Sequence, residues 1–89
     1  MKAIVTVVGK DRTGIIAKVS TTLCENNINI EDISQTIMQD MFTMIMLVNI
    51  EKCTKPFDVI SKELDKLGES LSLSIRIQHE DVFNSMHRI

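Results

Sequence analysis

The stretch Gly9-Lys10-Asp11-Arg12-Thr13-Gly14 combines residue types that can bind a small charged molecule. Its glycines let the backbone bend and approach a ligand closely. If a helix starts just after it, the first N–H groups of that helix lack acceptors within the helix and can bind a carboxylate or a phosphate. Asp11 offers an acceptor for an ammonium group, and Lys10 or Arg12 would attract an anion. An ordinary turn with solvated charges explains these residues equally well, so the loop alone leaves both interpretations open.

Other candidate chemistry in the sequence is weaker. His79 and His87 belong to a predicted terminal helix and are separated by about 12 Å along its axis, too far for both to bind one metal ion. We therefore expect no metal and no cofactor. Cys24 and Cys53 lack C-x-x-C spacing and are expected to be reduced, with Cys24 packed. Alternating methionines in a predicted hairpin favour core and interface packing over copper ligation: Met38, Met41, Met44 and Met46.

The periodicity of apolar residues predicts the elements that position this loop. Thr13 or Asp11 is expected to cap the first helix, and a bulge near Glu31-Asp32 reconciles two parities in the second strand. A turn near Asp40 separates that strand from the next one, and Gly68 is expected to end the second helix. The predicted elements are strands over 2–8, 28–39, 42–50 and 71–78, and helices over 13–26, 57–67 and 80–89.

This order of elements predicts an α+β fold, the ferredoxin-like βαββαβ sandwich. Right-handed crossovers give a four-stranded antiparallel sheet with two helices on one face, plus a short C-terminal helix. The strand over 71–78 would lie at one edge, followed by 2–8, 42–50 and 28–39. We expect one domain over 1–78, with an amphipathic helix over 79–89 that packs on the domain or on a partner subunit. That helix or a second subunit would cover the other face of the sheet.

Charge and hydropathy narrow the class of protein. The net charge of −2 argues against nucleic acid as the main partner, because phosphate neutralisation needs a basic surface. No apolar run approaches the roughly 20 residues that cross a bilayer, and the run over 3–8 is too short for a secretion signal. We therefore expect a cytoplasmic protein without a membrane or nucleic-acid partner.

The loop, followed by Ile15-Ile16 and by Asn27-Ile28-Asn29-Ile30, resembles the ACT domain family. The likeness extends from Met1 to about Gln78 and is greatest to the short stand-alone ACT proteins. The chain is also similar to the ACT modules of the glycine cleavage repressor. The resemblance implies a regulatory domain that binds an amino acid or a similar metabolite between two paired domains.

The family pattern also implies particular binding residues. The glycine of the family's first loop falls on Gly14, its polar loop position on Asp11, and the Asn that opens the second strand on Asn29. Gly9 replaces a His that some serine-binding members carry, so the resemblance does not identify the ligand. With this strand order, Asn29 would meet Asp11 more naturally across a dimer. The candidate ligand-binding residues are Gly9, Lys10, Asp11, Arg12, Thr13, Gly14, Ile15 and Asn29.

The expected function is therefore non-catalytic regulation by a homodimer that binds an amino acid and acts on a separate target protein. One alternative is a dimer that contacts another protein and binds no metabolite. An acylphosphatase-like enzyme shares the element order, and Arg12 and Asn29 echo its catalytic pair, but its longer loop is missing. RNA-recognition domains also share the topology, yet they stack bases on strand aromatics, and the predicted central strands offer only Phe42.

Overall fold

The predicted βαββαβ plan, with a short helix after it, is confirmed by the computed structural model, which describes residues 1–10 and 13–86. The predictions for Asp11, Arg12 and His87 therefore lie outside the described residues. Along the chain the elements are β1 (Lys2–Lys10), α1 (Ile15–Glu25), β2 (Asn29–Met38), β3 (Met41–Asn49), α2 (Phe57–Leu71), β4 (Leu73–His79) and α3 (Glu80–Met86).

The four strands of the described residues form one antiparallel sheet in the order β2-β3-β1-β4, as predicted. β1 is central because it pairs with β3 on one side and β4 on the other. The predicted bulge lies between Ile30 and Asp32, where the register against β3 shifts. β2 and β4 are the two edges, and β2 is thus the strand farthest from β4.

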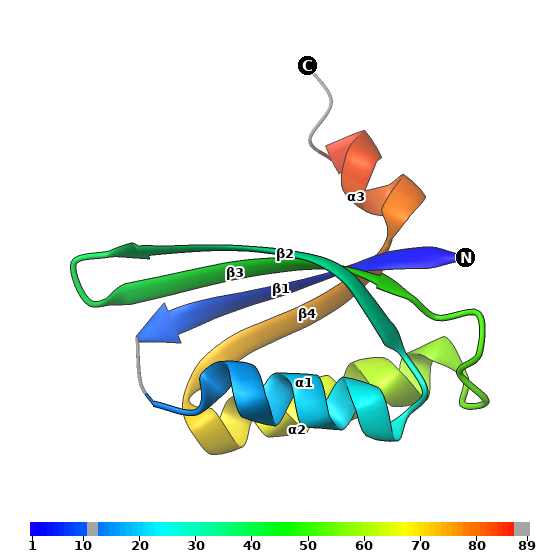
Figure 1. The fold of residues 1–89 in the computed structure, drawn as a ribbon, viewed down its shortest axis with the longest axis horizontal. Helices are drawn as coiled ribbons and strands as arrows, with labels where there is room; N and C mark the ends of the chain where they lie inside the picture. Colours follow the sequence, from blue (N-terminus) through cyan, green and yellow to red (C-terminus); the bar gives the residue numbers. More distant parts are fainter. Residues whose placement is uncertain (11–12, 87–89) are drawn as a thin grey trace.

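The sheet separates two unequal helical layers (Figure 1). α1 and α2 lie side by side beneath one face, whereas α3 lies on the opposite side of the sheet. α3 contacts β1 and β4 of its own chain. Ile4 of β1 points to this second face, as its partners on β3 and β4 do, and is only 8% exposed. The longer helical layer therefore builds the main core, and the short helix shields one corner of the other face.

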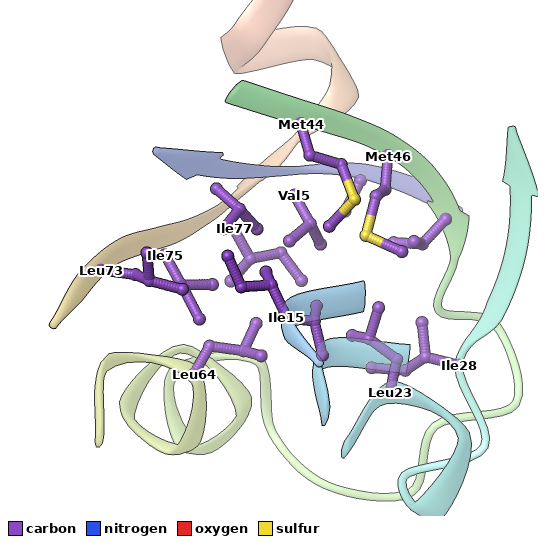
Figure 2. Close-up of a cluster of buried hydrophobic side chains, with 14 of the residues drawn as sticks. Val5, Ile15, Leu23, Ile28, Met44, Met46, Leu64, Leu73, Ile75 and Ile77 are labelled. Atoms are coloured by element: carbon purple, nitrogen blue, oxygen red, sulfur yellow. The ribbon is translucent and has the colours of Figure 1, made fainter. Parts of the chain in front are cut away.

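The core fills the space between the sheet and the α1–α2 layer (Figure 2). Alternate residues of β3 point into it, and Met44 and Met46 are fully buried, as the alternation predicted. From below, Leu23 of α1 and Leu64 of α2 close the same cluster. Unbranched methionines fill this space because their flexible chains adapt to the gaps between branched neighbours.

Four local predictions are wrong. α2 continues through Gly68 to Leu71, because Gly68 is buried against β4 and the helix ends instead at Ser72, whose φ is 58°. Gly14, not Thr13, occupies the N-cap of α1. His79 ends β4, where its ring stacks on Phe57 at a centroid distance of 4.1 Å, and does not lie in the terminal helix. Cys24 is exposed on α1, not packed.

Truncation of Met46 tests the position of the core. Met46→Ala should lower the free energy of unfolding by about 2–5 kcal/mol, since it removes a fully buried side chain and leaves a cavity. Met41→Ala is the matched control: its side chain is 47% exposed, so the loss should stay below about 1 kcal/mol. Urea denaturation of both variants measures the difference, and equal losses would contradict this core.

Candidate functional site

The first turn of α1 is open at its tip. Gly14 has φ 89° and ψ 2°, a left-handed conformation that a residue with a β-carbon adopts at a cost. Among the described residues, and apart from the two chain neighbours of Gly14, no heavy atom would lie within 4 Å of a Cβ built there. The backbone conformation, not crowding, therefore favours glycine, and the space beside it is empty of protein atoms among the described residues.

Three backbone donors at this tip have no acceptor within the helix. The first helical hydrogen bond runs from the Lys18 N–H to the Gly14 carbonyl, at 3.0 Å. The N–H groups of the three preceding residues are thus left over, as at any helix start. These residues line an open cleft of about 490 Å³ between α1 and β2, here called the α1–β2 cleft. On the α1 side its walls are Gly14, Ile15, Ile16 and Ala17.

The other wall of the α1–β2 cleft comes from the sheet. Gln35 and Ile37 of β2 and Phe42 of β3 supply it. Phe42 is buried, but Ile37 is 53% exposed and Ile16 38% exposed. The cleft therefore offers hydrogen-bond donors at one end and apolar surface along its length, which suits a small molecule with an anionic head and an aliphatic body.

The structure gives Gly9 a packing role. A Cβ at this position would overlap Cδ2 of Leu73, its pairing partner on β4, and lie 3.3 Å from the Leu73 Cα. Lys10 is exposed at the end of β1, and its Nζ lies 4.0 Å from Asp40 Oδ2. The ligand roles assigned to Gly9, Lys10 and Thr13 stay predictions, as do those of Asp11 and Arg12.

Asn29 lies at the other end of α1 from Gly14. α1 has eleven residues, so about 16 Å of helix separates the two ends. Asn29 instead lines a second open hollow of about 400 Å³, here called the asparagine pocket. Its walls are Cys24, Asn27, Ile28 and Asn29 on one side and Asn49, Glu51 and Lys52 on the other. One subunit therefore does not bring Asn29 to the Gly14 tip.

A Schellman motif fixes the α1 side of the asparagine pocket. The Ile28 N–H donates to the Leu23 carbonyl and the Asn27 N–H to the Cys24 carbonyl, both at 3.0 Å. Asn27 has φ 59°, in the left-handed region that Asn tolerates. The motif ends α1 sharply and turns the chain into β2.

A hydrogen-bonded turn fixes the opposite wall. The Cys53 N–H donates to the Ile50 carbonyl at 3.1 Å, so Glu51 and Lys52 are the two central residues of the turn. Asn49 holds its start, because its side-chain Oδ1 accepts the Glu51 N–H at 2.9 Å. Both walls are thus set by backbone geometry.

A polar network across three strands anchors Asn49. The Lys2 ammonium lies 2.9 Å from Glu31 Oε1, and Asn49 Nδ2 donates to Glu31 Oε2 at 3.4 Å. The hydrogen bond from Lys2 lowers the pKa of Glu31 below its ordinary value, with a further contribution from Asn49. The same pair raises the pKa of Lys2. The network ties the ends of β1, β2 and β3 together next to the asparagine pocket.

Sequence reasoning missed most of the asparagine pocket. It singled out Asn29 but not Asn27, Asn49, Glu51 or Lys52. The predicted strand order contained a usable signal: an antiparallel 28–39/42–50 pair brings the start of one strand to the end of the other, and Asn29 does pair with Asn49. Gln35 of the α1–β2 cleft was missed because the parity of β2 depends on the position of its bulge.

Neither hollow contains a set of metal ligands. Within residues 1–10 and 13–86, no group of three or more His, Cys, Asp or Glu side chains is placed to hold a metal ion. No helix formed by these residues is long and apolar enough to cross a membrane.

The fold of this chain and the glycine at the open start of its first helix match a class of small regulatory domains. The ACT domain model matches residues 2–78, and the chain belongs to the ACT domain family. This family consists of regulatory domains, which agrees with the expected regulatory role and gives no support to the acylphosphatase-like alternative.

Some related proteins have the same length as this chain, and others contain the same fold as part of a longer chain. A UPF0237 protein of Clostridium acetobutylicum is 57% identical over 89 residues, which is 100% of both chains. An ACT domain protein from Streptococcus pneumoniae superimposes with a TM-score of 0.82 at 42% identity, over 93% of each chain. A candidate glycine cleavage system transcriptional repressor follows with a TM-score of 0.71 at 25% identity, over 86% of this chain and 44% of that one.

The charged network predicts a pH-dependent contribution of Glu31 to stability. Because the pKa of Glu31 is lowered in the folded state, the carboxylate stabilises the fold above its ordinary pKa, and this contribution disappears as the pH falls through the lowered value. Melting curves should therefore show that Glu31→Gln lowers Tm near neutral pH but matches the parent protein in acid. Glu69→Gln, at an exposed position of α2, should show no such convergence. A Tm difference for Glu31→Gln that stays constant with pH would contradict the assigned network.

Proposed function

We propose that this chain is a non-catalytic regulatory domain that binds a free α-amino acid between two identical subunits. The observation that carries the proposal is the open tip of α1: three helix-start N–H groups and an unfilled space at Gly14, beside an apolar cleft. An α-carboxylate matches such donors, because it accepts several hydrogen bonds and its negative charge is favoured at a helix N-terminus. The aliphatic part of the ligand would contact Ile16 and Ile37.

The case for a second subunit rests on β2. Residues 31–40 are all exposed, and the stretch from Ile33 to Met38 contains no charged residue and no proline. Ile33 pairs with Met46 and Ile37 with Phe42, so both point to the helical face, yet they are 42% and 53% exposed. An uncharged edge strand with uncovered apolar side chains is a site for pairing with another strand.

Antiparallel pairing of two β2 strands would complete the binding site. A twofold axis perpendicular to the sheet places one residue of β2 opposite its own copy; if that residue is Ile33, near the middle of Asn29–Met38, Asn29 of one copy comes close to Ile37 of the other. Ile37 lines the α1–β2 cleft. This arrangement would bring Asn29 of one subunit towards the Gly14 tip of the other, although about 16 Å of helix separates them within a subunit.

The proposed output is a change in the dimer. A ligand between subunits favours the arrangement that it binds best, and a separate target protein would recognise that arrangement. The exposed thiol of Cys24 suits a reducing compartment, and we propose the cytosol.

Substitution of Gly14 tests the site. A thermal shift screen of the twenty standard L-amino acids should identify at least one that raises Tm of the parent protein. Gly14→Asn should abolish this rise, because Asn tolerates the left-handed backbone while its side chain fills the empty space. Ser72→Asn is the matched control, since Ser72 is exposed, has φ 58° and lies at the end of α2; it should keep the full shift.

Two outcomes of this screen would contradict the proposal. If Gly14→Asn keeps the full ligand-induced rise in Tm, the ligand does not bind at the α1 tip. If no amino acid shifts Tm of the parent protein while the chain is a stable dimer, the alternative of a dimer that contacts another protein without a metabolite would replace it.

A further inference from the structure

The asparagine pocket would meet the α1–β2 cleft of the second copy in the proposed dimer. This inference rests on the proposed function, because the two hollows adjoin only when β2 pairs with β2. Asn29 lines the asparagine pocket and, in that pairing, lies beside Ile37 of the other copy, which lines its cleft. In that arrangement the hollows of about 400 and 490 Å³ would lie next to each other at each end of the paired strands.

The two hollows offer different groups to a ligand. The described walls of the α1–β2 cleft carry helix-start donors, one amide and apolar side chains, but no carboxylate. The asparagine pocket carries Glu51 and Lys52. Within the described ranges, neither charged group forms an ion pair with another residue of the chain. The helix-start donors of the cleft would bind the carboxylate of an amino acid. The Glu51 carboxylate of the second copy would then be available for the ammonium group of the same ligand.

The position of Glu51 is set by its surroundings and not by its own side chain. Its N–H is held by Asn49 Oδ1, and the turn from Ile50 to Cys53 is closed by a backbone hydrogen bond. Asn49 is itself held by Glu31. Substitution of the Glu51 carboxylate therefore leaves the turn intact, which allows its role in binding to be separated from a role in folding.

We propose that Glu51 of the second copy accepts the ligand's ammonium group and that Lys52 beside it disfavours ligands with cationic side chains. The ligand class is then a free α-amino acid with a neutral or acidic side chain. Glu51 and Lys52 are specificity-determining residues of the composite site, in addition to the residues of the first loop.

A ligand pair that differs only in the ammonium group tests this assignment. The amino acid with the largest shift in the parent protein is compared with its α-hydroxy acid, for example L-alanine with L-lactate or L-aspartate with L-malate. Glu51→Gln should weaken the amino acid about tenfold or more, because it removes a charge-assisted hydrogen bond, and should leave the affinity of the hydroxy acid unchanged. Lys52→Met should improve the binding of L-lysine relative to the parent protein.

Matched variants keep the result interpretable. Glu69→Gln and Lys66→Met make the same chemical changes at exposed positions of α2 outside both hollows and should change neither affinity. Equal weakening of amino acid and hydroxy acid by Glu51→Gln, or no weakening of either, would overturn the role of Glu51 while the proposed function stands. If Asp11→Asn removes the preference for the amino acid over its hydroxy acid while Glu51→Gln keeps that preference, the role of Glu51 is also overturned. If no amino acid binds the parent protein, the proposed function itself fails.

Discussion

The sheet of this protein is wider than the helical layer that covers it, and most other features follow from this mismatch. α1 and α2 bury the helical face of β1, β3 and β4, but β2 extends beyond α1 with Ile33 and Ile37 uncovered. The hydrophobic effect favours removal of such side chains from water, and an uncharged edge strand supplies the backbone groups for pairing. We propose that a second copy covers the surface that the fold of one chain leaves open.

A residue in the left-handed conformation lies at each end of α1, but the two ends differ in chemistry. At the start, Gly14 leaves helix N–H groups open to a ligand. At the end, Asn27 closes the helix with a Schellman motif, in which the carbonyl groups of Leu23 and Cys24 accept hydrogen bonds. The start can thus bind an anion, while the end presents side chains of neighbouring segments, including Glu51. A twofold axis near the middle of β2 would bring the two kinds of end together.

The sequence predicted the fold well because each signal was local. Alternation placed Met44 and Met46 in the core, and the conflict of parities in β2 located its bulge. The errors came from tertiary packing. Gly68 resembled a helix stop but is buried where α2 contacts β4. Most of the asparagine pocket could not be predicted from the sequence, since Asn27 and Glu51 belong to segments that only the folded chain brings together.

Subunit mixing is the most direct test of a site shared between two copies. Gly14→Asn and Asn29→Ala each damage a different half of the site, so neither variant alone should bind the amino acid found for the parent protein. After the two variants are mixed, unfolded and refolded together, heterodimers carry one intact site, and about a quarter of all sites should regain binding by calorimetric titration. A mixture that binds no better than either variant alone would contradict the shared site.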